Sequence, residues 1–240
     1  MVKTSIEKFL KCGDVREGFA RVRCPDCREE FFVAFSCRQR SCCPSCDRKR
    51  AVLLGHRLKA EILAPVPHRQ WVFTIPKRLR RYFRFNRSLL GKLCRAAWET
   101  VQEVYAKEVD GDCGVPAMVG AVQTFGDLIH WHSHVHTIVS EGVFTSSGYF
   151  VHIPDIWRYK AVEIWQEKVF DLLQDACLLD METVASMRGW RHSGFHCNHP
   201  GCSPSGGAMH RALRASLRYE FALTIRCALV PETMTGCSGW

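Results

Sequence analysis

The sequence predicts an α+β fold in which a cysteine-rich unit precedes an antiparallel sheet with helices packed on it. Three observations carry this prediction. Cysteines cluster near the N-terminus, β-rich runs and long amphipathic helices follow, and two of the β-rich runs are joined by a short connection. With 240 residues, of which 47% are hydrophobic and 24% charged, the chain can bury a core, and wholesale disorder is excluded.

The elements of the predicted sheet and helices follow one another after the cysteine-rich part. A β-rich run at residues 70–75, closed by Pro76, predicts a buried strand. Apolar spacing then predicts an amphipathic helix at 88–107, two strands at 119–125 and 134–139, and a second amphipathic helix at 156–179. This order favours helices on one face of an antiparallel sheet.

Composition shifts predict three segments. Pro65 and Pro67 disfavour helix and mark a boundary, so we expect a cysteine-rich, basic domain at residues 1–62 and an α+β core at 63–195. Residues 196–240 contain clusters of Pro, Gly and Ser and end without a capped element. We expect this last segment to be irregular.

The charge is concentrated in the first part of the chain. Residues 1–90 hold 21 basic and 8 acidic side chains, a net charge of +13, whereas residues 91–240 hold 12 and 16, a net charge of −4. This asymmetry favours a nucleic-acid partner over a solvated basic surface without one. The candidate phosphate-binding residues are Arg38, Arg40, Arg48, Lys49 and Arg50.

Membrane insertion and secretion are not expected. No apolar run approaches the roughly 18 residues that a membrane span needs, and Lys3, Glu7 and Lys8 stand where a signal peptide would be apolar. We therefore expect a cytoplasmic, nucleoid-associated protein with no membrane partner.

Two C-x-x-C knuckles indicate a metal site. Cys24 and Cys27 are separated by fifteen residues from Cys43 and Cys46, which is the spacing of a tetrahedral four-thiolate zinc site. In a reducing compartment clustered thiols favour metal binding over disulfides. We expect these four cysteines to hold a structural zinc, with the fifteen intervening residues forming a hairpin.

Further cysteines leave the zinc stoichiometry open. Cys12, Cys37 and Cys42 lie in the same segment, and Cys12 and Cys37 are additional candidate ligands. A second zinc on these three thiolates would need a fourth donor, for which His56 is the only histidine in the segment.

A histidine-rich run indicates a second, different metal site. His134 and His136 alternate on a predicted strand, so both side chains project from one face and can bind one ion. Two imidazoles with one oxygen ligand suit a divalent ion that polarises a phosphodiester. For the third ligand, Gln123 on the neighbouring strand, Asp127 in the connection and His132 on the same face remain open.

These motifs resemble those of a known family. Residues 9–13, 18–27, 34–37 and 43–46 resemble the zinc-binding domain of the rolling-circle insertion-sequence transposases of the IS91 type. Residues 69–76, and residues 123–128 through to 134–136, resemble the HUH nuclease domain (histidine, hydrophobic residue, histidine) that follows it. The resemblance runs from about residue 9 to residue 195.

The resemblance implies a DNA strand transferase. In such enzymes a tyrosine hydroxyl attacks a phosphodiester of single-stranded DNA and leaves a 5′-phosphotyrosine and a free 3′-hydroxyl, assisted by Mg²⁺ or Mn²⁺ on the histidine pair. The family nucleophile lies on a helix beyond the histidine strand, and Tyr219 is the candidate in that part of this chain.

The C-terminal part departs from the family pattern. The sequence has no two tyrosines spaced by four residues, and the residues flanking Tyr219 do not match, so a structural role for Tyr219 stays open. We expect a C-terminally truncated or frame-disrupted copy that is impaired in transposition.

Two other functions compete with a transposase. A non-enzymatic zinc-ribbon DNA-binding protein with structural histidines would bind DNA without metal-dependent cleavage. A nucleotide hydrolase of the histidine-triad kind would use residues 132–136, but Ser133 is not the hydrophobic spacer it needs, and the cysteine knuckles stay unexplained.

Overall fold

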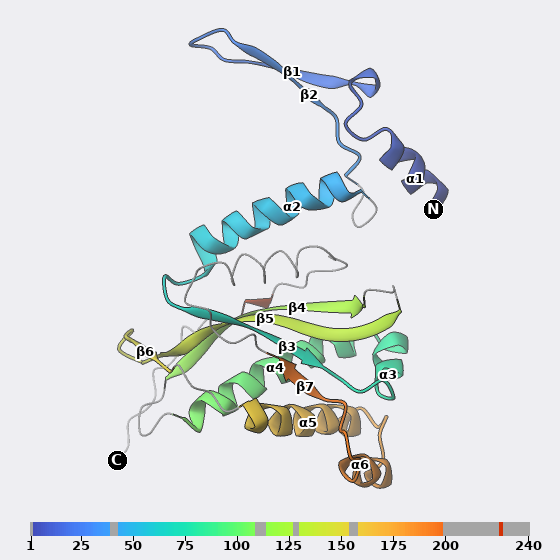
Figure 1. The fold of residues 1–240 in the computed structure, drawn as a ribbon, viewed down its shortest axis with the longest axis vertical. Coiled ribbons are helices and arrows are strands. Elements are labelled where there is room, and N and C mark those ends of the chain that lie inside the picture. Colours follow the sequence, from blue (N-terminus) through green and yellow to red (C-terminus); the bar gives the residue numbers. More distant parts are fainter. Residues whose placement is uncertain are drawn as a thin grey trace. The chain divides into compact units, whose positions relative to one another are not determined.

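The computed structural model describes residues 2–38, 43–108, 114–126, 130–153, 158–198 and 226–227. Clustering of contacts separates two compact units, with the boundary between Leu63 and Ala64 (Figure 1). We refer to residues 2–63 as the N-terminal unit and to residues 64–198 with 226–227 as the C-terminal unit.

The N-terminal unit is built from two helices and a hairpin. Helix α1 (Val2–Leu10) and a short 3₁₀ turn (Val15–Glu17) lead into the antiparallel hairpin of β1 (Phe19–Arg23) and β2 (Glu30–Ala34). Helix α2 (Pro44–Arg57) follows and ends in a π-helical turn (Leu58–Ile62). Pro44 starts α2 because its fixed φ suits the first helical turn and its missing N–H would have no partner there.

An antiparallel sheet forms the C-terminal unit. Its strands are β3 (His68–Thr74), β4 (Val115–Phe125), β5 (Trp131–Phe144), β6 (Phe150–His152), β7 (His196–Asn198) and β8 (Arg226–Cys227). Within the described residues the strand order is β7-β3-β5-β4-β8, and β6 pairs with β5. Strand β5 is therefore central, with β3 on one side and β4 on the other.

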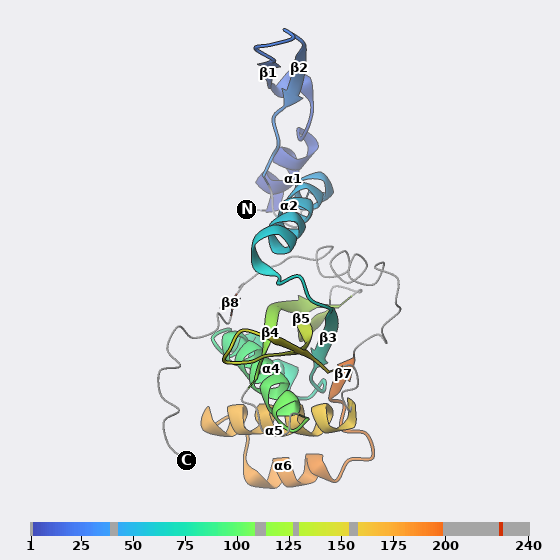
Figure 2. The same cartoon turned by 90° about the vertical axis from the view of Figure 1, so that its left-hand side faces the viewer.

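Helices cover one face of this sheet. Helices α4 (Leu89–Ala106) and α5 (Arg158–Asp175) lie on the same side of it (Figure 2), while α3 (Arg80–Phe85) and α6 (Met181–Arg188) are shorter. The predicted α+β class with an antiparallel sheet is confirmed. No helix in the described part of the chain is long and apolar enough to cross a membrane.

Alternation along β5 separates the core from the opposite face. Val135 and Val139 are fully buried and belong to one apolar cluster with Phe73 of β3 and Trp165 of α5. The Trp165 indole N–H donates to the Thr74 carbonyl at 2.9 Å, and its ring packs on Phe73. Because side chains alternate along a strand, the even-numbered histidines of β5 project from the other face.

The observed elements differ from the predicted ones mainly at their ends. Strand β5 runs well beyond the predicted 134–139 at both ends. The predicted helix 156–179 ends at Asp175, because Cys177 takes a left-handed φ of 54° and Asp180 caps the new helix α6. Residues 196–198, which the sequence assigns to an irregular tail, form the strand β7 beside β3.

A buried tyrosine links α4 to the central strand, and removing its hydroxyl should destabilise the C-terminal unit. The Tyr105 hydroxyl donates to the Ser140 carbonyl at 2.7 Å. We expect Tyr105→Phe to lower the free energy of unfolding by about 1 kcal/mol in urea titrations, because a buried hydrogen bond is lost. Tyr149→Phe is the control, since that side chain is 74% exposed. Equal effects of the two substitutions would contradict this assignment.

Candidate functional site

Four cysteine thiols meet in the N-terminal unit. The sulfur atoms of Cys12, Cys37, Cys43 and Cys46 all lie within 4.8 Å of one another. The Cys12 Sγ is 3.5 Å from that of Cys43 and 3.7 Å from that of Cys46. Zinc–thiolate bonds of about 2.3 Å in a tetrahedron put sulfur atoms about 3.8 Å apart. The cluster therefore has the donor type, number and spacing for a structural zinc.

Local structure orients these thiols. Cys43 caps α2 and Cys46 lies in its first turn, where the helix dipole favours a thiolate. Burial opposes ionisation of Cys43, but hydrogen bonds from the Cys46 backbone N–H and the neighbouring thiols lower its pKa. The Cys37 backbone N–H donates to the Cys12 sulfur at 3.4 Å. Backbone N–H groups thus already hold and polarise the sulfur atoms that would bind a metal.

The thiols that meet are not the predicted set. Cys43 and Cys46 lie with Cys12 and Cys37, whereas the other predicted ligands, Cys24 and Cys27, follow β1 in the hairpin turn. The five-residue strand β1 spans about 16 Å, so the turn lies far from the end of the hairpin where the four thiols gather.

Hairpin closure explains the observed set. The Gly13 N–H donates to the Phe35 carbonyl, and the Phe35 N–H donates to the Gly18 carbonyl. These bonds bring together the two chain segments that flank the hairpin, and with them Cys12 and Cys37. Cys42 lies outside the described residues.

The predicted metal-binding histidines lie on the face of the sheet opposite the helices. On central strand β5, His134 is directly opposite Gln123 of β4 and Thr74 of β3. The ring centroids of His134 and His136 are 4.8 Å apart. The structure therefore brings together three of the predicted residues, His134, His136 and Gln123, on neighbouring strands.

Hydrogen bonds fix which atoms these side chains present. The His134 Nδ1 lies 2.9 Å from the His132 carbonyl and donates to it, which leaves Nε2 with the lone pair. The Gln123 amide nitrogen donates to the Phe125 carbonyl at 3.1 Å, so its amide oxygen remains as the potential ligand. Both arrangements suit metal binding.

His136 is held as a neutral imidazole. Burial, followed by the neighbouring His134 and His132, lowers the pKa of His136 to about 4. The Gln70 side-chain amide nitrogen lies 3.3 Å from the His136 Nδ1 and donates to it, so Nδ1 is the acceptor and Nε2 carries the proton. Metal ligation through Nε2 would require the other tautomer, in which Nδ1–H donates to the Gln70 amide oxygen.

The remaining predicted site residues have separate outcomes. His132 lies in the same column, with its ring centroid 4.7 Å from that of His134. Burial, then Arg80 and the other histidines, lowers the pKa of His132 to about 4, and its Nε2 has no hydrogen-bond partner among the described residues. Asp127 and Tyr219 lie outside the described residues.

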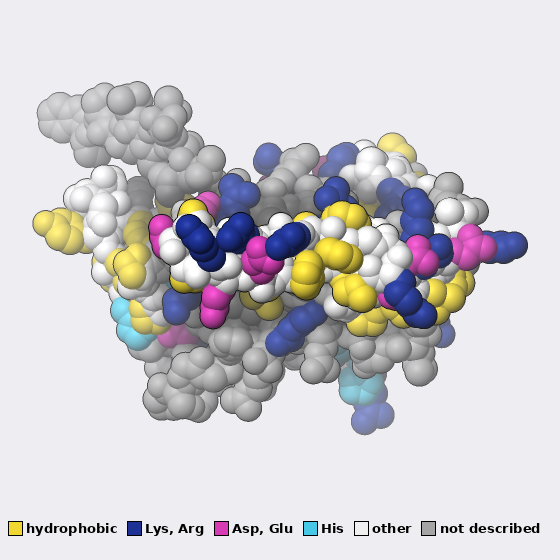
Figure 3. Space-filling view, turned by 90° about the horizontal axis from the view of Figure 1, so that it is seen from above, with side chains coloured by type: hydrophobic (Ala, Val, Ile, Leu, Met, Phe, Trp, Pro, Cys, Tyr) yellow, Lys and Arg dark blue, Asp and Glu magenta, His cyan; other side chains and the backbone are white. Residues whose placement is uncertain are grey.

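The predicted phosphate-binding residues are accessible where they are described. Arg48, Lys49 and Arg50 are exposed on α2, and Arg38 is exposed before it, whereas Arg40 lies outside the described residues. In the space-filling view, Lys and Arg side chains lie along the visible face, with hydrophobic and some acidic side chains between them (Figure 3). Such a surface can contact both phosphates and bases.

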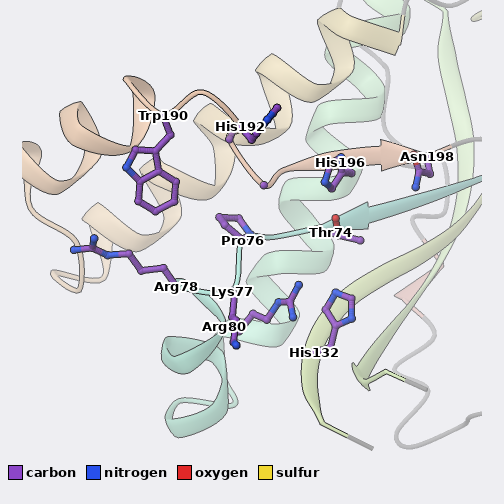
Figure 4. Close-up of a pocket in the computed structure, with 12 residues that line it drawn as sticks. Thr74, Pro76, Lys77, Arg78, Arg80, His132, Trp190, His192, His196 and Asn198 are labelled. Atoms are coloured by element: carbon purple, nitrogen blue, oxygen red, sulfur yellow. The ribbon is translucent and has the colours of Figure 1, made fainter. Parts of the chain in front are cut away.

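A pocket that the sequence pattern did not predict lies beside the histidine column. A pocket of about 590 Å³ is lined by residues from the end of β3, the start of α3, strand β5 and the connection from α6 to β7 (Figure 4). Its polar lining includes Lys77, Arg80, His132 and His196, and Trp190 adds an aromatic ring. In the sequence, the basic residues after Pro76 were the indication of this pocket. Only the fold brings Trp190 and His196 next to those residues.

The cysteine cluster and the histidine-bearing sheet are the two candidate sites of this protein, and comparisons with known proteins indicate the class to which it is similar. Residues 1–75 match the family described as "Transposase zinc-binding domain", and residues 117–189 match the family described as "Putative transposase". The transposase for insertion sequence element IS801 of Pseudomonas savastanoi pv. phaseolicola is 31% identical over 147 residues, which are 60% of this chain and 34% of that protein. No solved structure matches the chain.

Together these matches support an IS91-type transposase with an N-terminal zinc-binding domain. The predicted family is therefore confirmed, and the zinc-binding domain together with the four-cysteine cluster supports the predicted structural zinc. The chain spans about a third of the length of the IS801 transposase.

The cluster geometry predicts which cysteines retain zinc. We expect Cys12→Ser and Cys37→Ser to lose the zinc of this cluster on dialysis against a chelator, because three thiolates hold the ion less tightly than four. Cys24→Ser and Cys27→Ser should keep it, since both residues lie at the hairpin turn. Zinc per protein chain, measured by mass spectrometry, is the readout. Zinc loss in the Cys24 and Cys27 variants alone would favour the ligand set predicted from the sequence.

Proposed function

We propose that this protein is a transposase, or the remnant of one, that cleaves and rejoins single-stranded DNA in rolling-circle transposition through a divalent metal site at His134 and His136. The observation that carries the proposal is the convergence of both histidines with Gln123 on one face of the sheet. Similarity to transposases supports DNA as the substrate. We place this activity in the cytoplasm, at the nucleoid.

The protein groups would prepare a phosphodiester for attack. His134 and His136 would offer imidazole nitrogens and Gln123 an amide oxygen, a donor set that leaves coordination positions open. A Mg²⁺ or Mn²⁺ ion bound there would stabilise the negative charge that develops on the phosphate oxygens. Asp127 is the alternative oxygen donor of this proposal.

A tyrosine supplies the nucleophile in this proposal, and Tyr219 is the candidate. Its phenolic oxygen would form a bond to phosphorus while the bond from phosphorus to the 3′-oxygen breaks, and the phenolic proton would pass to the leaving oxygen. The phosphotyrosine ester conserves the bond for rejoining, when a 3′-hydroxyl attacks the same phosphorus.

DNA binding is assigned to the basic part of the chain. The net charge of +13 over residues 1–90 and the exposure of Arg48, Lys49 and Arg50 support this assignment. Phosphate contacts from these side chains would release counterions and give most of the affinity. The histidine face would then act on DNA that is already bound.

The metal site predicts separable losses. We expect the double substitution His134→Ala and His136→Ala to reduce Mn²⁺ affinity by at least about a hundredfold and to abolish Mn²⁺-dependent cleavage, while DNA binding stays near wild type. Gln123→Ala should weaken Mn²⁺ binding less, by about tenfold. Calorimetry measures the metal affinity, and a denaturing gel with labelled single-stranded DNA measures cleavage and covalent adduct.

Control variants distinguish metal-dependent DNA cleavage from DNA binding without catalysis. His152→Ala removes a histidine of the same unit that lies outside the column and should change neither readout. Tyr219→Phe should remove the covalent adduct while leaving Mn²⁺ affinity unchanged. Binding of DNA by the wild-type protein without any Mn²⁺-dependent cleavage would support the alternative, a non-enzymatic zinc-ribbon DNA-binding protein.

The basic helix predicts a change in salt dependence. Log affinity falls linearly with log salt concentration, and each phosphate contact contributes about 0.7 to 0.9 to the steepness of this fall. We expect the triple substitution of Arg48, Lys49 and Arg50 by Gln to make the slope less negative by about two to three. Arg95→Gln is the control, since Arg95 is exposed on α4, outside the basic part. An unchanged slope in the triple variant would place the phosphate contacts elsewhere.

A further inference from the structure

The pocket beside the histidine column contains Arg80, which is held in place by hydrogen bonds and has no acidic partner among the residues that the structure describes. The Arg80 Nε donates to the Ile75 carbonyl at 3.2 Å, and the Arg80 carbonyl accepts from the Trp131 indole N–H at 2.9 Å. Within the described residues this half-buried guanidinium forms no ion pair, and burial lowers the pKa of Arg80. A preorganised cation that is partly removed from water favours an anionic ligand.

The opposite side of the pocket offers an aromatic surface. Trp190 follows helix α6, is 37% exposed and lines the pocket. Figure 4 shows its indole on the far side of Pro76 from the Arg80 side chain, which extends toward His132. The pocket therefore has one part with Arg80 and His132 and another with Trp190, with Pro76 between them, and Arg78 adds a cation on the Trp190 side.

A close backbone approach builds the wall between these two parts. Gly194 has a left-handed φ of 72°, and a Cβ atom at this position would lie 2.9 Å from the Cβ of Pro76. Only glycine allows the connection from α6 to β7 to pack this tightly against the end of β3. Trp190 and His196 are thereby fixed next to the chain that carries Lys77 and Arg80.

The pocket borders the proposed metal site through His132. His132 lines it, and the His132 ring lies directly beside that of His134. The buried Nε2 of His132, which has no protein partner in the described part of the chain, provides a polar atom for a ligand at this junction. A ligand in the pocket would lie next to a phosphate bound at His134 and His136.

We propose that this pocket binds one unpaired nucleotide of the DNA strand, adjacent to the phosphate that is cleaved. Arg80 and Lys77 hold the phosphate of this nucleotide, and Trp190 stacks on its base. The inference rests on the proposed function for the position of the scissile phosphate. The volume of the pocket is in the range of small-ligand sites and admits a single base. A base in a duplex has both faces stacked on its neighbours and is not free to stack on Trp190.

A base-deletion experiment tests the stacking contact. Wild type and Trp190→Ala are titrated with ten-nucleotide thymidine oligonucleotides in which one abasic site is moved along the strand, without added Mn²⁺, and binding is followed by fluorescence anisotropy. We expect Trp190→Ala to weaken binding of the intact oligonucleotide about tenfold. At one position of the strand, the abasic site should weaken binding to the wild-type protein by a similar factor. The same abasic site should not change the affinity of Trp190→Ala, because that variant lacks the ring on which the missing base would stack.

Matched variants exclude a general loss of structure. Trp190→Phe keeps an aromatic ring and should restore most of the affinity, while Tyr149→Ala removes an exposed aromatic ring outside the pocket and should have no effect. Arg80→Gln should make the slope of log affinity against log salt concentration less negative by about one. Arg84→Gln, on the same helix but outside the pocket lining, should leave the slope unchanged.

The outcomes separate this inference from the proposed function. Wild-type-like binding by Trp190→Ala and Arg80→Gln would overturn the pocket assignment, even if wild-type protein cleaves DNA with Mn²⁺. Equal losses for double-stranded and single-stranded DNA would also overturn it, because an unpaired base would not be required. Conversely, absence of cleavage by wild type would overturn the proposed function, while the abasic-site coupling to Trp190 would still support a nucleotide in the pocket.

Discussion

The alternation of side chains along the central strand β5 is the constraint on which the C-terminal unit depends. Val135 and Val139 project into the apolar core, so His134 and His136 must project from the opposite face. Strands β3 and β4 flank β5 on both sides, which fixes its register and sets Gln123 opposite His134. A shift of one residue would place imidazoles in the core and valines on the functional face. Folding of this sheet and assembly of the proposed metal site are therefore the same event.

The N-terminal unit depends on a different stabilising interaction. Among its described residues, the buried apolar side chains are those of Cys43, Cys46, Ala51 and Leu58, and the first two belong to the thiol cluster. The hairpin strands are exposed along almost their whole length. So small an apolar core cannot offset the loss of conformational entropy on folding, whereas a four-thiolate zinc supplies folding free energy directly. The metal thus takes the place of a hydrophobic core.

Local patterns predicted much of the fold and of the candidate site, and long-range closure accounts for the differences. Strict alternation identified His134 and His136, and apolar spacing located helix α4 to within one residue at each end. The C-x-x-C spacing correctly indicated a zinc-binding domain, but it cannot show which pairs of thiols meet. Hydrogen bonds between Gly13, Gly18 and Phe35 bring Cys12 to Cys37 instead. The pocket was missed for the same reason, since Arg80 and Trp190 are distant in sequence.

The electrostatics of the histidine face fit a site that binds anions and a metal together. Burial and the nearby Arg80 keep His132 neutral, and burial and the adjacent histidines keep His136 neutral, as their lowered pKa values show. If these imidazoles were protonated, they would repel both a divalent cation and the Arg80 guanidinium. Neutral imidazoles instead leave the positive charge of the pocket lining on Lys77, Arg78 and Arg80, where it can attract a phosphate. The same burial that favours metal ligation therefore allows a cationic pocket to form beside it without mutual repulsion.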